Sequence, residues 1–328
     1  MHTTNQGTVY KKIIGHYVVH AGDRVITCEI SSRLRKDLRY PTADPTSIRP
    51  HVVRVQKIQA IDPVAVGDEV RFVESADSNG MIVEVLPRRS MLVRREATGP
   101  FARHAFVQVV VSNLDQVVPV FAAAQPTPKW SLLDRYLVSA ESLDLPSLIC
   151  ITKLDLVADS GIAAIAEMYR RIGYQVILTS AVSGDGIAEL GEALRGKVSV
   201  LVGKSGVGKT SLLNAIHPGL GLRVNAVSAL TGKGMHTTSN LEMIPFSEDG
   251  GPGGGVVDTP GIREFGLWQV ADSEIALMFP EMRSYVGTCR FGLDCRHDKE
   301  PGCAIRQAVA SGNVSQERYE SMLKLRAG

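Results

Sequence analysis

Residues 203 to 210 read Gly203-Lys204-Ser205-Gly206-Val207-Gly208-Lys209-Thr210, directly after the apolar run 198–202. The glycines allow backbone N–H groups to wrap around phosphates, and a helix that begins after the loop reinforces this binding. The Lys209 ammonium is then a cation for the β and γ phosphates, and the Thr210 hydroxyl is a Mg²⁺ ligand. A chance glycine-rich turn is the alternative, but the flanking strand and helix patterns favour a phosphate loop. The residues predicted to contact the phosphates are Gly203, Lys204, Ser205, Gly206, Val207, Gly208, Lys209, Thr210 and Ser211.

A second pair of motifs predicts that the nucleotide base is guanine. Thr152-Lys153-Leu154-Asp155 follows one apolar run, and Ser180-Ala181 follows the next. The Asp155 carboxylate can accept hydrogen bonds from N1–H and from the exocyclic amine of guanine, a pattern that adenine lacks. Thr152 stands where this motif usually has Asn. Alone, the tetrapeptide would be an ordinary strand-end loop; together the motifs predict guanine recognition by Thr152, Lys153, Asp155, Ser180 and Ala181.

The order of the motifs is unusual. In an ordinary GTPase the phosphate loop precedes the guanine motif, whereas here it follows. Because all the other expected pieces are present, the simplest interpretation is a complete GTPase domain whose chain is circularly permuted. The old termini are then joined near residues 195–197, and the fold opens just after Gly261.

The remaining nucleotide motifs lie downstream of the phosphate loop. Asp258-Thr259-Pro260-Gly261 follows a strand-like run, so that Asp258 can hold Mg²⁺ through water and the Gly261 N–H can sense the γ-phosphate. Between the two motifs, Thr238 is preferred over Thr237 as the second threonine ligand of Mg²⁺. Ile262 occupies the position of the water-orienting Gln of Ras-like enzymes, which predicts slow intrinsic hydrolysis. His236 is the internal candidate to orient the water, and a bystander loop histidine is the alternative.

Composition indicates a globular protein. The chain has 328 residues, 44% of them hydrophobic and 21% charged, with a formal net charge of +2. The most hydrophobic stretch, 106–124, is broken by polar residues, and the first residues do not resemble a signal peptide. We therefore expect a cytoplasmic protein with no membrane partner, acting as a monomer.

The sequence divides into three regions. Residues 1–97 read as short strands separated by turns, which predicts a small β-barrel of the OB-fold type. Basic clusters such as Arg33-Leu34-Arg35-Lys36 favour contact with RNA, although a barrel that only packs on its neighbour is the alternative. Residues 98–283 alternate strands and helices, which predicts a doubly wound P-loop GTPase domain. Residues 33–51 are interpreted as a lengthened barrel loop.

A cysteine cluster marks the third region, residues 284–328, which is expected to carry helices. Cys289, Cys295, His297 and Cys303 form a C-x5-C-x-H-x5-C pattern. This donor set predicts one tetrahedral Zn²⁺ in a closed structural site. A disulfide is the competing interpretation, but the expected cytoplasmic location and the odd number of cysteines disfavour it. The other two cysteines, Cys28 and Cys150, lie in strand-like runs and are expected in the core.

The chain resembles the ribosome small-subunit-dependent GTPases of the RsgA or YjeQ family over nearly its whole length. The resemblance rests on the OB-like start, the permuted order, His236-Thr237-Thr238, the segment 258–265, and the cysteine cluster. It implies binding to the small ribosomal subunit and its rRNA late in assembly, and hydrolysis of GTP to GDP that the subunit stimulates. It also implies that His236 acts in hydrolysis and that the cysteine cluster holds zinc.

Two other functions stay open at this point. One is an RNA-binding assembly chaperone that keeps its nucleotide, for which Ile262 is the argument. The other is a permuted GTPase of the large subunit, which the arrangement of barrel before and zinc after disfavours. The permutation also suggests a mechanism, because the chain runs from Gly261 almost directly into the zinc region. Bound GTP would fix the barrel and the C-terminal region in one arrangement, and GTP hydrolysis would release that arrangement.

Overall fold

A computed structural model of the chain describes residues 4–13, 15–32, 34, 40–43, 52–56, 63–74, 79–96, 106–158, 161–220, 242–245, 254–258 and 270–327. The chain forms two compact units. The first comprises residues 1–115, 194–200 and 231–261, and the second comprises residues 116–193, 201–230 and 262–328.

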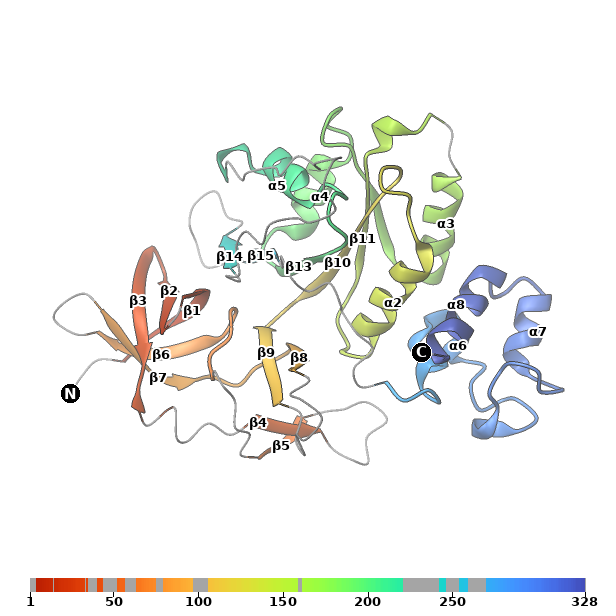
Figure 1. Ribbon diagram of the computed structural model, residues 1–328, viewed down its shortest axis with the longest axis horizontal. Helices are drawn as coiled ribbons and strands as arrows, with labels where there is room; N and C mark the ends of the chain where they lie inside the picture. The colour runs from red at the N-terminus through yellow and green to blue at the C-terminus, as the bar shows by residue number, and fades with distance from the viewer. Residues whose placement is uncertain are drawn as a thin grey trace. The chain divides into compact units, whose positions relative to one another are not determined.

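A closed five-stranded barrel forms the body of the first unit (Figure 1). Its strands follow the order β1-β2-β3-β7-β6, and β6 pairs back onto β1. Strands β3 and β7 are parallel and the other pairs are antiparallel. This five-stranded barrel fits the predicted OB-fold. The strands are β1 (Thr4–Ile13), β2 (His16–Ala21), β3 (Arg24–Ile30), β6 (Glu69–Glu74) and β7 (Gly80–Val85).

Buried residues of β3 and β6 alternate with exposed ones and fill the barrel interior. In β3, Ile26 and Cys28 are buried and Thr27 between them is exposed, as in a strand with one face towards the core. Gly80 of β7 lies opposite Cys28, and a Cβ at this position would come within 2.4 Å of the Cys28 Sγ. The close approach of two strands therefore requires glycine here.

Three further strand pairs belong to the first unit. The stretch 33–51, interpreted as a lengthened barrel loop, lies between barrel strands β3 and β6 and contains β4, which pairs with β5 in antiparallel fashion in a sheet of its own. Three of the five residues of β5 are valines, and β-branched residues favour extended backbone. The strands are β4 (Tyr40–Ala43), β5 (Val52–Gln56), β8 (Met91–Glu96) with β9 (Phe106–Ser112), and β14 (Glu242–Pro245) with β15 (Gly255–Asp258).

The second unit is built on strands in the order β12-β11-β10-β13, of which β13 contributes its last two residues to this unit. Strand β11 is parallel to both of its neighbours. Every residue of β10 and β11 is buried, as expected for central strands covered by helices on both faces. The predicted α/β architecture is confirmed. The strands are β10 (Gln116–Ala122), β11 (Leu148–Thr152), β12 (Gln175–Leu178) and β13 (Val198–Val202).

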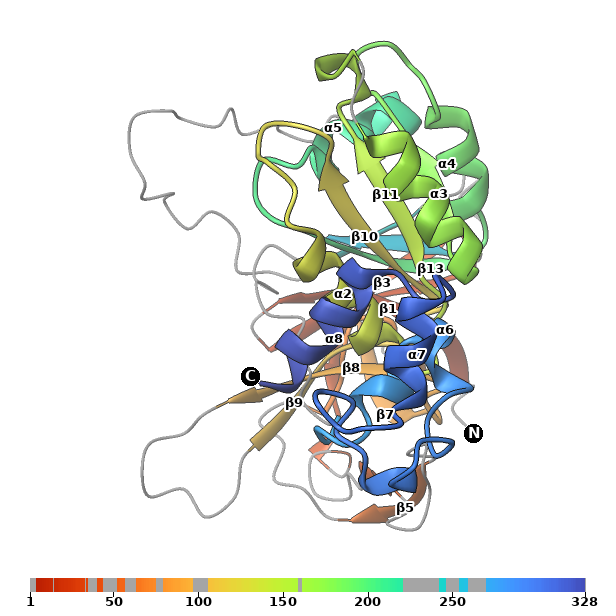
Figure 2. The same cartoon turned by 90° about the vertical axis from the view of Figure 1, so that its right-hand side faces the viewer.

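Helices α2 (Trp130–Glu141) and α3 (Ile162–Ile172) lie on one side of this sheet and α4 (Ile187–Leu194) and α5 (Lys209–Ile216) on the other (Figure 1), and Figure 2 shows the same elements turned by 90°. Helices α2 and α3 meet where the Tyr169 hydroxyl donates to Asp134 at 2.7 Å. Helices α4 and α5 meet at Gly191, where a Cβ would lie 3.2 Å from Ile216. No helix in the described ranges is long and apolar enough to cross a lipid bilayer.

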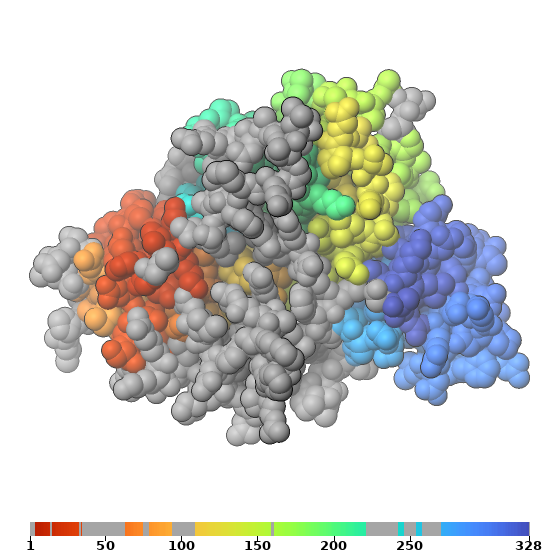
Figure 3. Space-filling view, viewed as in Figure 1, coloured from red at the N-terminus to blue at the C-terminus, as the bar shows by residue number. Residues whose placement is uncertain are grey.

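The C-terminal helices pack on α2 and so belong to the second unit. Their apolar core includes Phe279, Met282, Ile305 and Met322, and Val138 of α2 joins it. Figure 3 shows the C-terminal segment lying against the segment that contains α2. The elements are η3 (Ile275–Met278), α6 (Pro280–Arg283), η4 (Gly292–Asp294), α7 (Ala304–Ala310) and α8 (Gln316–Arg326).

A buried ion cluster joins α8 to α2. The Arg318 guanidinium donates to Glu281 at 2.6 and 3.1 Å and to Asp134 at 2.5 Å, and it lies 4.4 Å from the centre of the Phe279 ring. Burial acts to lower the pKa of Arg318, but the two carboxylates outweigh it and raise that pKa above its ordinary value. The side chain is 1% exposed, so these partners replace water entirely.

We expect Arg318→Met to lower the free energy of unfolding by about 3–5 kcal/mol, because the change leaves two buried carboxylates without a cation. Urea denaturation of the full chain measures the effect. Lys324→Met is the matched control, since Lys324 is an exposed residue of α8 that forms an ion pair with Glu320 on the same helix. The control is expected to change stability by less than about 0.5 kcal/mol. Equal effects of the two substitutions would show that the cluster does not stabilise the unit.

Candidate functional site

The predicted phosphate loop lies between β13 and α5, as its motif requires. Gly206 and Gly208 have φ values of 81° and 99°, a left-handed backbone that favours glycine. The Lys209 ammonium donates to the carbonyl oxygens of Gly203 and Lys204 at 2.8 and 3.2 Å. The loop therefore holds this cation against its own backbone. The helix that follows the loop begins at Lys209.

The guanine motif lies against the phosphate loop. The Thr152 hydroxyl donates to the Val207 carbonyl at 2.5 Å, and the Lys153 ammonium donates to the Gly206 carbonyl at 2.7 Å. Lys153 also donates to the carbonyl of Gln125, in the segment after β10. Thr152 thus has a physical role in place of Asn, because its hydroxyl fastens the end of β11 to the loop. The structure brings together two motifs that are more than 50 residues apart.

Asp155 is held by the second part of the predicted base site. The buried Ser180 hydroxyl donates to the Asp155 carboxylate at 2.5 Å and accepts from the N–H groups of Val182 and Ser183 at 3.2 and 3.1 Å. Asp155 itself is exposed, and Ala181 directly follows the serine that orients it. A fixed, exposed carboxylate at this position is arranged to accept hydrogen bonds from a ligand.

The structure describes only one of the four other residues predicted to act at the nucleotide. Asp258 is the last residue of β15, where its backbone pairs with Glu242 of β14. His236, Thr238 and Gly261 lie outside the described residues.

The four predicted metal ligands form one compact cluster. The ligand atoms of Cys289, Cys295, His297 and Cys303 all lie within 4.8 Å of one another, and all four residues are buried. The His297 Nδ1 is 3.5 Å from the sulfur atoms of Cys289 and Cys303. Three thiols and one imidazole at these distances suit a tetrahedral metal ion.

Residues outside the motif support this cluster. The Tyr319 hydroxyl of α8 donates to the His297 carbonyl at 2.6 Å, and the Ala304 N–H donates to the Cys289 sulfur at 3.2 Å. Such contacts fix the orientation of metal ligands. Sequence reasoning missed them, because Tyr319 carries no local signal that links it to a histidine 22 residues earlier.

Comparison with known proteins decides the family. The model of the RsgA GTPase family matches residues 85–268. The chain is 44% identical over 265 residues to the small ribosomal subunit biogenesis GTPase RsgA of Gemmatimonas aurantiaca, covering 80% of this chain and 83% of that protein. The RsgA of Pseudomonas aeruginosa is 44% identical over 78% of this chain and 73% of its own length. This chain belongs to the RsgA GTPase family.

Solved structures extend the likeness to the whole chain. YjeQ from Thermotoga maritima matches with a TM-score of 0.73 and 28% identity, over 99% of this chain and 98% of that one. YloQ, described as a circularly permuted GTPase, matches with a TM-score of 0.69 and 32% identity, over 99% of this chain and 95% of that one. The predicted membership of the RsgA family and the permuted fold are therefore confirmed.

The two remaining cysteines are core residues, as expected. Cys28 and Cys150 are fully buried, and all five cysteines of the chain are free thiols. Burial raises the pKa of each of these two thiols to about 12. Both thiols are thus protonated near neutral pH and are poor nucleophiles or metal ligands.

Proposed function

We propose that this chain binds the small ribosomal subunit and hydrolyses GTP to GDP and phosphate late in the assembly of that subunit, which stimulates the hydrolysis. The observation that carries the proposal is the contact of the phosphate loop with the guanine motif, through Thr152 and Lys153, in a member of the RsgA GTPase family. The related proteins from Gemmatimonas and Pseudomonas are named for small-subunit biogenesis.

The residue roles follow from side-chain chemistry. Asp155 reads the guanine edge and the phosphate loop, 203–211, wraps the phosphates, with Lys209 as the cation. GTPases use GTP with Mg²⁺, for which Thr210 and Thr238 are the proposed ligands. Asp258 would act on Mg²⁺ through water, and the Gly261 N–H would contact the γ-phosphate.

We propose that three regions of the chain have different functions. Residues 1–97 form a barrel that contacts rRNA, residues 98–283 form the GTPase domain, and residues 284–328 form the metal-binding region. The OB-fold supports the first assignment, because such barrels commonly bind nucleic acids. We propose a cytoplasmic monomer whose partners are the small subunit, its rRNA and guanine nucleotides.

Turnover of GTP with isolated ribosomal subunits tests the proposal. We expect the purified chain to sediment with small subunits and to hydrolyse GTP much faster in their presence than alone or with large subunits. Stimulation by large subunits alone would indicate a large-subunit GTPase. Binding of small subunits without any increase in turnover would indicate an assembly chaperone instead.

Asp155→Asn is expected to weaken GTP binding and to favour xanthosine triphosphate, because the amide donates to the 2-oxo group of xanthine where the carboxylate would repel it. Competition of the two nucleotides for the full chain measures the change. Glu167→Gln is the matched control, since it makes the same chemical change at an exposed surface pair with Arg171. Unchanged base selectivity in Asp155→Asn would exclude this residue as the guanine reader.

We propose that the cysteine cluster holds one structural Zn²⁺. Cys295→Ser, or removal of the metal with a chelator, is expected to unfold the C-terminal region from its metal-binding loop while leaving much of the nucleotide binding intact, because the four ligands are the buried residues of the loop 289–303. Metal analysis, far-UV circular dichroism and GDP binding measure these effects. Cys28→Ala, which removes a thiol outside the cluster, is expected to keep its zinc. Freshly purified protein without zinc would contradict the assignment.

A further inference from the structure

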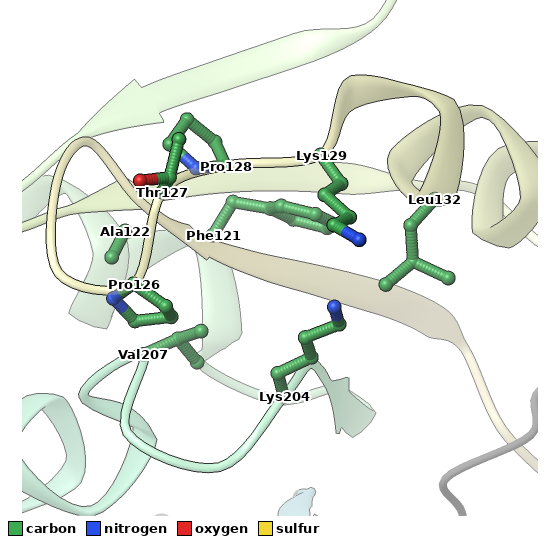
Figure 4. A pocket seen from close by; sticks show the side chains of 9 residues that line it. All are labelled: Phe121, Ala122, Pro126, Thr127, Pro128, Lys129, Leu132, Lys204 and Val207. Carbon is green, nitrogen blue, oxygen red and sulfur yellow. The ribbon is translucent and has the colours of Figure 1, made fainter.

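The space beside the phosphate loop, shown in Figure 4, is closed by its own apolar lining. Phe121, Ala122 and Val207 lie there and are at most 5% exposed. Because these side chains already contact protein, the space gives no reason to place a further ligand beside the nucleotide. A more specific arrangement of polar groups surrounds His297 in the metal-binding loop, residues 289–303.

Three backbone N–H groups around His297 converge on one carboxylate. They donate to Glu300 at 3.1, 3.0 and 3.1 Å and belong to Arg296, Asp298 and Lys299. The N–H of Glu300 itself and these three N–H groups lower the pKa of the Glu300 carboxyl, against the opposing effect of burial. The group is therefore an anion near neutral pH, and it has enough lone pairs to accept all three bonds.

The backbone of His297 is in an unfavourable conformation. Its φ is 59°, in the left-handed region that costs free energy for a residue with a Cβ. In this conformation the His297 Nδ1 lies 3.5 Å from the sulfur atoms of Cys289 and Cys303. Two of the N–H groups that bind Glu300 belong to the residues directly before and after His297, so these bonds offset the cost of the turn.

Different elements hold the two sides of His297. The Tyr319 hydroxyl of α8 binds its carbonyl oxygen at 2.6 Å, whereas Glu300, within the loop itself, binds the flanking N–H groups. Among the described residues, the group of possible metal ligands contains His297 and three cysteines but not Glu300. Glu300 can therefore act on a metal ion only through the ligand that it orients.

We propose that Glu300 is a positioning residue of the metal site, which holds His297 in the left-handed turn that makes its imidazole the fourth ligand. The inference rests on the proposed zinc site and assigns a role that the metal-ligand pattern in the sequence does not include. Without Glu300, three cysteines remain to bind the metal, and the histidine has to adopt the costly turn unaided.

Glu300→Ala is expected to raise the zinc dissociation constant of the full chain about 10- to 100-fold, the range for loss of a group that orients a metal ligand. Competition with a chromophoric zinc chelator measures this constant. Asp298→Ala is the matched control, because it removes an exposed carboxylate next to His297 and keeps the N–H that donates to Glu300. Its effect should stay below about threefold.

Glu300→Gln keeps the shape of the side chain and is the second variant, which decides the matter if Glu300→Ala does not fold. Its amide has one acceptor oxygen in place of two, so we expect zinc binding that is at least about threefold weaker than in the unaltered chain and tighter than in Glu300→Ala.

The His297→Ala background separates positioning of the histidine from general support of the loop. In that background Glu300→Ala should change the zinc dissociation constant less than about threefold, because no imidazole is left to position. Cobalt provides a second readout, since its visible absorption depends on the ligand set. Cobalt-loaded Glu300→Ala should shift toward the spectrum of cobalt-loaded His297→Ala, and Asp298→Ala should keep the spectrum of the unaltered chain.

A loss of zinc affinity that is as large in the His297→Ala background as in the unaltered chain would overturn the proposal, because Glu300 would then support the loop rather than the histidine. Equal losses in Glu300→Ala and Asp298→Ala would overturn it as well, since both would reflect charge near the metal. If the unaltered chain binds zinc and Glu300→Gln binds it as tightly, the positioning role is wrong and the metal site stands. An unaltered chain that binds no zinc contradicts the metal site itself, and this inference with it.

Discussion

Lys209→Ala is expected to lower the rate of GTP turnover by a factor of at least about 10². Removing one preorganised group that stabilises transition-state charge typically lowers a rate about 10²- to 10³-fold. The Lys209 ammonium is held by two carbonyl oxygens of the phosphate loop, at 2.8 and 3.2 Å. The cation is therefore already in place before any phosphate binds. Alanine removes both the charge and this preorganisation, so chemistry is affected in addition to nucleotide affinity.

Single-turnover hydrolysis at saturating GTP separates the two effects, because it removes the contribution of weaker binding. Lys299→Ala is the matched control: it deletes an exposed lysine in the metal-binding loop and is expected to leave turnover within about twofold of the unaltered chain. Thr210→Ala should also abolish most turnover, through loss of a Mg²⁺ ligand. Turnover at the unaltered rate in Lys209→Ala would show that residues 203–210 are not the phosphate site.

Local patterns were sufficient to predict several of the strands around the candidate nucleotide site. The apolar run 198–202 has the bounds of strand β13 in the structure, because it is a continuous apolar run between turn signals. The barrel strands were predicted as short strand-like runs separated by turn residues. Helix α4 was not predicted from the sequence, although it closes the layer against α5.

Contacts between distant segments could not be predicted in this way. The ion pair of Arg318 with Asp134 joins residues that are 184 positions apart in the sequence. The residues next to them in the sequence give no indication that either charge is buried. The same limit applies to Gln125, whose backbone carbonyl binds Lys153. A backbone carbonyl is present at every residue, so no sequence signal distinguishes this one.

The Arg318 cluster also changes the mechanism that the permuted order suggested. If hydrolysis released the C-terminal region from the GTPase domain, Arg318 of α8 would separate from Asp134 of α2, leaving buried charges unpaired. The apolar core that Val138 of α2 shares with the C-terminal helices would open as well. The packing therefore argues against independent repositioning of the C-terminal region, and favours a metal-binding region that moves together with α2.

If the C-terminal region does not move independently, GTP hydrolysis depends on residues that act at the γ-phosphate. The sequence indicates His236 as a candidate. We expect His236→Ala to lower subunit-stimulated GTP hydrolysis about 10²- to 10⁴-fold, the range for loss of a group that positions or activates a reactant. The reason is that Ile262 occupies the position of the usual water-orienting Gln and cannot hold a water molecule. His236 is the residue that the family resemblance assigns to this task.

The magnitude of this loss has to be separated from damage to the switch, because the proposed Mg²⁺ ligand Thr238 is only two residues away. Binding of a non-hydrolysable GTP analogue, measured in the same variant, should change less than about threefold, since a group that orients water acts mainly in the transition state. His236→Gln should recover part of the rate, because an amide can orient water as the Gln of Ras-like enzymes does. If stimulated turnover is unchanged in His236→Ala while analogue binding is normal, His236 is a bystander and the small subunit itself orients the water. If analogue binding collapses together with turnover, the residue supports Mg²⁺ coordination rather than the attack of water.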